Sequence, residues 1–238
     1  MPNWVRTRIS FYGKKERVNE IREFVKSVKD DQTNEFDFNK IVPMPEDLNI
    51  PSSSLGSWGM KYLMLKAKHP ITWSDDERNF MNEAKASEKK NPKNFSESID
   101  LGKKYLKNIA NYGCTSWYEW CCDNWGTKWN ACETAWIADD VVEFETAWSF
   151  CEPVIKKLSE LYPDVEISFS YADEDAGSNT GDGLYIAGKG VDCEYPPTAS
   201  NRAYEIFLDL HPEYEDELVL DPDTNKYYWV EDEDELTF

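Results

Sequence analysis

The stretch Trp4-Val5-Arg6-Thr7-Arg8-Ile9-Ser10-Phe11-Tyr12 decides how this chain folds, because its apolar and polar residues alternate. Alternation with a period of two is typical of a strand with one buried face. Gly13 follows, and from Lys14 to Lys29 the apolar residues recur at the three- and four-residue spacing of an amphipathic helix. The order strand, glycine turn, helix predicts the opening of a β-α unit.

The second half of the chain repeats this order. Segments 129–137 and 141–148 indicate two strands around an Asp139-Asp140 turn, residues 153–161 a helix, and segments 165–172 and 184–187 further strands. Strand–helix–strand repeated twice predicts an α+β, ferredoxin-like (split β-α-β) fold, with an antiparallel sheet and helices on one face. We therefore expect residues 4–12 to share one sheet with segments near 129–137, 141–148 and 165–172.

Other segments indicate elaborations of this core. Residues 36–42 suggest a short extended segment, and two helical stretches follow at roughly 74–90 and 95–110, the first with a capping box from Ser74 to Glu77. A later helix is expected over 198–211, with Ala203, Ile206, Phe207 and Leu210 facing inward. The predicted organisation is a ferredoxin-like core from 1–48 and 112–192, a helical insertion at 49–111, and an acidic C-terminal helix and hairpin extension at 193–238.

Residues 112–136 are unusually rich in tryptophan and cysteine. Core packing explains this composition, with Trp129, Trp136, Phe144 and Trp148 expected to lie against Ile21, Val25 and Leu158. The alternative is an exposed aromatic platform that stacks bases or a peptide. The acidity of the surrounding chain disfavours a nucleic acid as the ligand of such a platform.

Several pieces together resemble a known family. They are Met1-Pro2-Asn3-Trp4-Val5 with Arg8, Phe38 to Glu46, Trp117 to Cys121, Asn124 to Trp129, Thr146-Ala147-Trp148, and Pro153-Val154-Ile155. In these the chain resembles the YubB-like family of phage- and plasmid-borne proteins of unknown function with a ferredoxin-like domain. The resemblance spans residues 1 to about 175. It implies the fold and a mobile-element origin, and it implies no activity.

Charge is divided unevenly along the chain. Residues 1–129 carry 21 Lys and Arg against 18 Asp and Glu, whereas residues 130–238 carry 5 against 28. So acidic a region repels nucleic acid and attracts basic partners. No stretch is apolar enough to span a bilayer and the N-terminus lacks a secretory pattern, so we expect a cytoplasmic protein of a bacterial host cell with reduced cysteines.

Motifs for metals, cofactors and catalysis are weak. Cys114, Cys121, Cys122 and Cys132 lack the paired spacing of a zinc site. The Asp221-Pro-Asp223-Thr-Asn225 run starts like an EF-hand loop, but Lys226 stands where glycine is needed. Phosphate-binding glycine motifs are missing from the sequence. We expect no metal, no cofactor and no enzymatic activity.

These observations favour an interaction protein. The leading hypothesis is a phage or mobile-element accessory protein that inhibits a host defence nuclease, of anti-CRISPR or anti-restriction type, by presenting an acidic surface that mimics DNA. Its partner would be a basic, nucleic-acid-binding host protein, bound without direct contact to nucleic acid or membrane. The alternatives are a non-catalytic small-molecule or cation-binding accessory protein and a cysteine-dependent enzyme using Cys121 or Cys122.

The predicted partner-binding residues are the carboxylates of the C-terminal half. They are Asp173, Glu174, Asp175, Asp182, Glu213, Glu215, Asp216, Glu217, Glu231, Asp232, Glu233, Asp234 and Glu235. Interleaved aromatic residues, Tyr214, Tyr227, Tyr228 and Trp229, are expected to anchor them at fixed spacing. Disordered acidic tails usually lack such aromatics, which favours a recognition surface; the alternative is a solvated, partly disordered tail.

Overall fold

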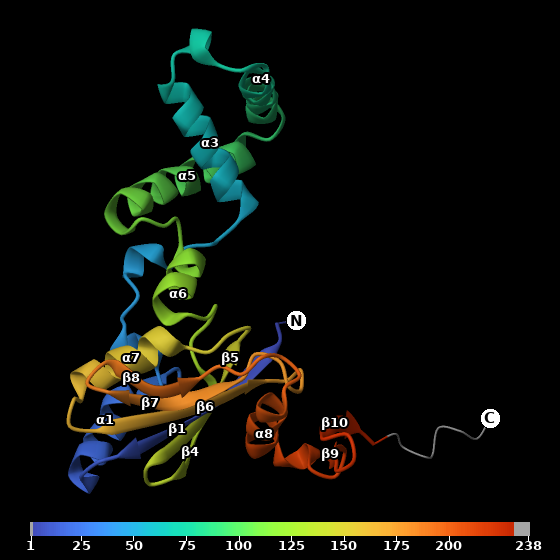
Figure 1. Cartoon of the computed structure of the whole chain (residues 1–238). Helices are drawn as coiled ribbons and strands as arrows, with labels where there is room; N and C mark the ends of the chain where they lie inside the picture. Colours follow the sequence, from blue (N-terminus) through green and yellow to red (C-terminus); the bar gives the residue numbers. More distant parts are fainter. Residues whose placement is uncertain (1, 231–238) are drawn as a thin grey trace. The chain divides into compact units, whose positions relative to one another are not determined.

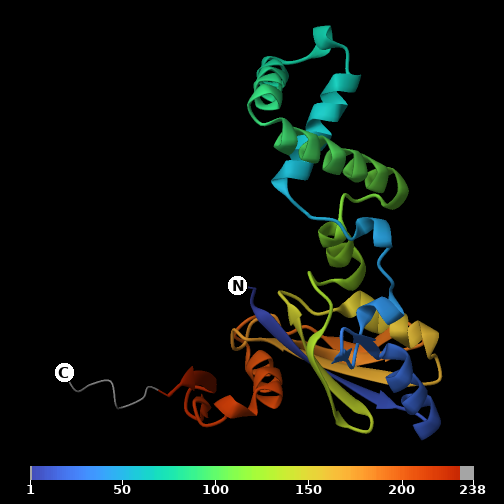
Figure 2. The same cartoon turned by 180° about the vertical axis from the view of Figure 1, so that it is seen from behind.

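The computed structural model describes residues 2–230, which form two compact units. One, the sheet unit, combines the chain up to Pro43 with the chain from Cys122 onward. The other, the helical unit, is Met44–Cys121. Figures 1 and 2 show that the sheet unit draws on both ends of the sequence, in blue and in yellow to red. The helical unit is thus continuous in sequence and interrupts the sheet unit.

A six-stranded antiparallel sheet organises the sheet unit. Its order is β4 (Cys132–Ala138), β5 (Val141–Ala147), β1 (Trp4–Tyr12), β6 (Glu166–Asp173), β7 (Gly181–Ile186) and β8 (Lys189–Glu194). β1 is one of the two central strands, and its Val5 lies opposite Thr146 of β5 and Asp173 of β6. The predicted sheet is confirmed, and the α+β, ferredoxin-like class with it.

One face of this sheet holds the main core. Alternate residues of β1, including Val5 and Ile9, are fully buried there. Helices α1 (Lys15–Val25) and α7 (Glu152–Leu161) contribute Ile21 and Leu158 to it. A short helix, α2 (Phe38–Ile41), packs beside them. The expectation of an extended segment over 36–42 is wrong, because the Asp37 carboxylate accepts a hydrogen bond from the Asn39 N–H at 2.9 Å and caps a helical turn.

The C-terminal segment covers part of the opposite face. Helix α8 (Asn201–Leu210) packs on β6, and Figure 1 shows it across the sheet from α7. A single turn, η3 (Pro212–Tyr214), leads to a hairpin of β9 (Leu218–Asp221) and β10 (Lys226–Trp229). Phe207 and Leu218 bury their side chains with Ala172 of β6 in a second, smaller core. A further hairpin, β2 (Ser27–Lys29) with β3 (Gln32–Asn34), follows α1.

The helical unit is built on the close approach of α3 (Ser54–Ala67) to α5 (Pro92–Tyr112). A methyl group at Gly59 would overlap the backbone of Ser98, and one at Gly102 would overlap the backbone of Gly59. Along the chain, η2 (Pro70–Thr72) and α4 (Asp75–Lys90) come between these two helices. The predicted Ser74–Glu77 capping box of α4 is confirmed. The unit begins with η1 (Glu46–Leu48) and ends within α6 (Trp117–Trp125). Within residues 2–230, every helix is too short or too polar to cross a membrane.

The tryptophan-rich segment divides between core and surface. Trp120 and Trp125 are buried, and Phe144 is buried as expected. Trp136 is half-buried, with its ring against Phe11 and under the Arg22 guanidinium. Trp129 and Trp148 are 38% and 44% exposed, so the expectation that these two pack in the core is wrong. Trp148 comes directly after the last paired residue of β5, where the alternation of strand faces no longer applies.

Candidate functional site

The polar face of β1 anchors the C-terminal segment. Because the odd-numbered residues of β1 point into the main core, Arg6 and Arg8 project toward α8. Arg6 donates hydrogen bonds from Nη1 to the Leu210 carbonyl oxygen at 2.8 Å and to Glu213 Oε1 at 3.1 Å. It thereby satisfies a carbonyl at the C-terminal end of α8, where the helix dipole favours a cation.

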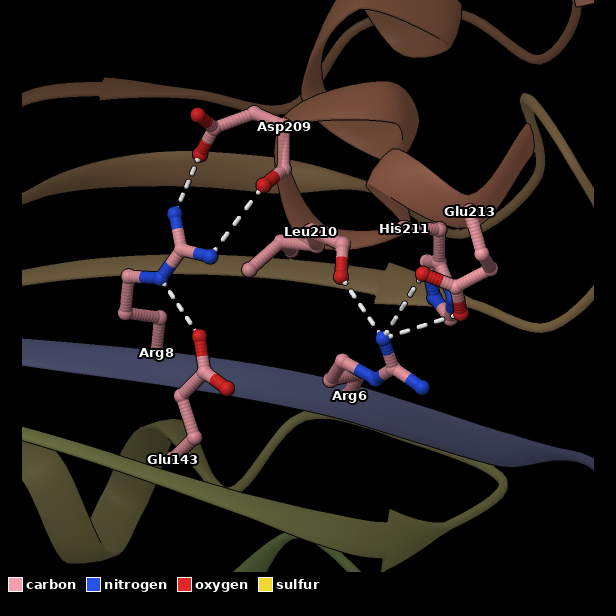
Figure 3. A network of polar contacts seen from close by, with 7 residues as sticks. All are labelled: Arg6, Arg8, Glu143, Asp209, Leu210, His211 and Glu213. Carbon is pink, nitrogen blue, oxygen red and sulfur yellow. Dashed lines mark hydrogen bonds and ion pairs between the residues drawn. The ribbon is translucent and has the colours of Figure 1, made fainter. Parts of the chain in front are cut away.

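Arg8 joins three elements in the same way. Its Nε donates to Glu143 Oε1 of β5 at 2.7 Å, while Nη1 and Nη2 donate to the side-chain and backbone oxygens of Asp209 at 2.8 and 3.1 Å (Figure 3). Arg202 on α8 forms ion pairs with Asp182 and Glu194, and so ties the helix to β7 and β8. Three arginines therefore hold α8 on the sheet through half-exposed ion pairs.

His211 ends α8 inside this network. Its ring stacks on Phe207 with centroids 4.5 Å apart, and Nδ1 lies 3.3 Å from Glu213 Oε1. Nε2 is buried without a hydrogen-bond partner of ordinary geometry among the described residues. Burial, and then the Arg6 guanidinium, lower the pKa of His211 below its usual value, so that the ring is neutral at pH 7.

A small pocket of about 170 Å³ opens beside His211. Its lining is Trp4, Arg6, Glu145, Glu174, His211, Glu213 and Tyr214. Burial raises the pKa of Glu145, Arg6 opposes this shift, and the carboxylates of Glu133 and Glu174 add to it. Carboxylates thus outnumber the one arginine in the lining of this pocket.

The structure divides the predicted acidic residues into three groups. Three of them have partners within the fold: Asp173 is 5% exposed and accepts hydrogen bonds from Asn3 and Asn179, the half-buried Asp182 pairs with Arg202, and the exposed Glu213 pairs with Arg6. Five others are exposed, namely Glu174, Asp175, Glu215, Asp216 and Glu217. Glu231 to Glu235 lie outside the described residues. Asp173, Asp182 and Glu213 therefore each have a partner within the fold, and that they also bind another protein stays a prediction.

The exposed acids stand on an ordered base. Glu215, Asp216 and Glu217 form the turn between η3 and β9, and the Glu217 carbonyl accepts a hydrogen bond from Val230 at 2.7 Å. No ion pair to these three carboxylates is found among the described residues. On either side of them, Tyr214 packs on Phe207 and Leu218 is buried. Three consecutive carboxylates without an ion pair thus lie on a turn whose two flanking residues are packed.

The predicted aromatic anchors behave in two ways. Tyr214 and Tyr227 are half-buried and pack on Phe207 and Tyr204, so they attach the hairpin to α8. Tyr228 and Trp229 are 52% and 48% exposed on β10. These two remain available to a partner, while Tyr214 and Tyr227 serve the fold.

The surroundings of the cysteines and of the Asp221 loop bear on the metal and cysteine hypotheses. Among the described residues no group of three or more His, Cys, Asp or Glu is placed to hold a metal ion. The Asp221 carboxylate instead closes its own turn by accepting from the Asp223 N–H and the Thr224 hydroxyl. Cys121 is buried and Cys122 half-buried, and burial, followed by Glu145 and Glu133, raises the pKa of Cys132 to about 11. A raised pKa reduces the thiolate fraction on which nucleophilic attack depends.

Two features of this surface lay beyond the sequence analysis. The alternation of β1 indicates that Arg6 and Arg8 lie on the polar face, but it does not indicate that α8 covers that face. The cluster of Lys128 with Trp129 and Trp148 had no signal of this kind in the sequence, because these residues come from the end of β5 and the segment before β4.

Comparisons with known proteins bear on part of this structure. Residues 124–211 match the family model of the ferredoxin-like domain in Api92-like protein, a range that runs from the end of α6 to His211. A crystal structure of the protein api92 from Yersinia pseudotuberculosis is similar to this chain at 12% sequence identity and a TM-score of 0.39. The similarity covers 83% of this chain and 99% of that one. No curated protein matches the chain.

Proposed function

We propose that this protein acts by binding another protein, and that its acidic surface takes the place of nucleic acid on a basic, nucleic-acid-binding host partner. The partner class that fits is a host defence nuclease, a CRISPR effector or a restriction enzyme. The protein would be encoded by a phage or another mobile element, and it would act in the bacterial cytoplasm. The protein performs no chemistry in this proposal.

The observation that carries the proposal is where the negative charge resides. The helical unit is nearly balanced, with 10 acidic and 11 basic residues, whereas the sheet unit has 36 and 15 and a net charge of −21. Self-repulsion on this scale opposes compaction, so folding alone does not account for it. The three arginines at α8, which are Arg6, Arg8 and Arg202, form ion pairs within the sheet unit. Glu174, Asp175 and residues 215–217 face solvent.

The order of this surface also supports the proposal. A mimic of nucleic acid needs carboxylates at fixed positions, because phosphates lie at fixed spacing along a strand. Leu218, Tyr214 and Tyr227 anchor the C-terminal hairpin on α8, and Arg6 and Arg8 anchor α8 on β1. The acidic turn is therefore presented by packed structure, so less conformational entropy is lost on binding.

The test is a capture experiment in a bacterial lysate at low and at high salt, followed by competition. The variant neutralises the acidic turn with Glu215→Gln, Asp216→Asn and Glu217→Gln. The control removes the same charge from exposed positions of the helical unit, with Asp76→Asn, Glu83→Gln and Glu88→Gln. We expect a partner that wild type and control retain at low salt, that high salt or duplex DNA releases, and that the variant fails to capture.

The proposal is contradicted by a partner that binds wild type and the neutralised variant equally well with the same salt dependence. A competition experiment then tests whether the protein mimics nucleic acid. Added DNA should displace the protein from the partner to the extent that the partner binds the DNA. A partner whose DNA binding is unchanged by saturating protein would remove nucleic-acid mimicry from the proposal.

A further inference from the structure

Two exposed indoles hold a positive charge between them at one end of the sheet. The Lys128 ammonium lies 4.3 Å from the ring centroid of Trp129 and 4.4 Å from that of Trp148. Trp4 extends the cluster, with its ring centroid 6.0 Å from that of Trp129. A cation over an aromatic face is attracted by the negative potential of the ring, and here one cation serves two faces. We call Trp129 and Trp148 the tryptophan clamp.

The backbone holds one side of this clamp in a rare conformation. The φ of Trp148 is 72°, in the left-handed region that a bulky residue seldom adopts. Its N–H donates to the Asn3 carbonyl at 2.9 Å, and its carbonyl accepts from Asn179 Nδ2 at 3.1 Å. Both hydrogen bonds fix a residue whose ring is 44% exposed. Strain that is maintained at an exposed side chain points to a use for that side chain outside the core.

Carboxylates are attached to the same residues. Asn3, which binds the Trp148 N–H, donates its side-chain amide to Asp173 Oδ1 at 3.2 Å and to Asp175 Oδ2 at 3.0 Å. Glu174 is bonded through its own N–H to the Trp4 carbonyl at 2.9 Å. Glu174 also lines one pocket with Trp4, and Glu174 and Asp175 are both exposed. Aromatic faces with adjacent carboxylates favour a cationic ligand.

We propose that the tryptophan clamp receives an arginine side chain of the basic partner, which displaces Lys128 from between the rings, with Glu174 and Asp175 as counter-charges. The inference rests on the proposed function and names a contact within it. Lys128 serves as the internal stand-in, since its ammonium shows which chemistry the clamp accepts. Arginine suits the space better than lysine because its guanidinium is planar, stacks on aromatic rings and is more weakly hydrated.

The probe for the clamp is a peptide of nine arginines, with a peptide of nine lysines as its charge-matched counterpart. Binding is measured in 0.5 M KCl, where exposed ion pairs are screened within about 4 Å. The indole N–H signals in the NMR spectrum, assigned with single tryptophan variants, report which rings the peptide reaches. We expect the Trp129 and Trp148 signals to move, and to move more with arginine than with lysine.

Three variants test the clamp on the full chain. Trp129→Leu and Trp148→Asn each remove one ring, and asparagine tolerates the positive φ at 148, so the fold is kept. Each should weaken arginine-peptide binding by about three- to thirtyfold, the range of one cation–π contact. Lys128→Met removes the stand-in and should strengthen binding by a similar factor. Tyr12→Leu is the control, because the Tyr12 ring is 55% exposed and the described residues place no cation over it.

The outcomes separate the clamp from the proposed function. Should Trp129→Leu and Trp148→Asn bind the arginine peptide and the captured partner as wild type does, while neutralising residues 215–217 abolishes capture, the clamp is wrong and the proposed function stands. Loss of binding in the clamp variants alone, with the neutralised variant unaffected, supports the clamp and rejects the acidic turn. Unchanged affinity in Lys128→Met rejects the displacement of Lys128.

Discussion

At the scale of single residues, His211 makes the attachment of α8 sensitive to acid. Its pKa is lowered in the folded protein, first by burial and then by Arg6, while in the unfolded chain it has the ordinary value of about 6.5. The unfolded chain therefore binds more protons between these two values. The stability contributed by the neutral ring is complete above about pH 6.5 and is lost as the pH falls toward the folded pKa.

We expect the melting temperature of the sheet unit to fall when the pH is lowered from 7.5 to 5.5. The decrease should be smaller in His211→Phe than in wild type, by about 2 °C or more. Phenylalanine keeps the stack on Phe207 and removes the titration. His69→Asn, at an exposed histidine of the helical unit, should retain the full decrease. Glu145 acts in the opposite sense, since its raised pKa adds stability on acidification. Equal decreases in wild type and His211→Phe, measured by calorimetry, would contradict the role of His211.

Single residues also show what the sequence could predict and what it could not. The alternation of apolar residues placed Val5, Ile9 and Phe11 in the core correctly, because burial follows the period of a strand. It placed Trp148 there wrongly, since that residue lies one position beyond the paired strand, with a backbone that period-two reasoning does not describe. Asp173 was read as a surface acid, and only its partners in space, Asn3 and Asn179, make it internal.

At the scale of elements, the approach of α3 to α5 is the most sensitive feature of the helical unit. Gly59 meets the backbone of Ser98 and Gly102 that of Gly59, so neither neighbour is a flexible side chain that can move aside. We expect Gly59→Ala to separate the two helices and to cost the helical unit about 1–3 kcal/mol or more, despite the better helix propensity of alanine. Urea unfolding followed by circular dichroism measures this loss.

Ser96→Ala is the matched control for that substitution, because Ser96 lies exposed on α5. It should leave the urea midpoint unchanged or raise it slightly. A Gly59→Ala variant as stable as Ser96→Ala would show that the helices cross at a wider distance than the structure gives.

Elements were also the level at which sequence reasoning did best. Periodicity and capping located β1, α4, α7 and α8 to within a few residues, because these elements carry strong amphipathic or capping signals. The α2 turn was missed, since a four-residue helix has no period to detect and depends on the cap at Asp37. The pairing of Arg6 and Arg8 with α8 joins positions about 200 residues apart, a contact that local patterns do not encode.

At the scale of the whole molecule, the two units should respond differently to salt. The sheet unit carries a net charge of −21 and the helical unit +1. Raising KCl from 0.05 to 0.5 M screens self-repulsion, so the sheet unit should become more stable while the helical unit changes little. Hydrogen exchange during thermal or urea unfolding, read from peptides of each unit, distinguishes them. A sheet unit destabilised by salt would mean that its internal ion pairs outweigh its net repulsion.

The central position of β1 has a consequence for the order of synthesis. Its neighbours in the sheet, β5 and β6, are translated more than 120 residues after it, and the whole helical unit comes in between. The nascent chain therefore completes a contiguous helical unit while the first strand still lacks both hydrogen-bonding neighbours. Closing so long a loop is slow, and an unpaired strand is prone to wrong associations. In the cell, the helical unit can thus fold on the ribosome first. The sheet can form around β1 only after the acidic second half of the chain, which contains β5 and β6, has been synthesised.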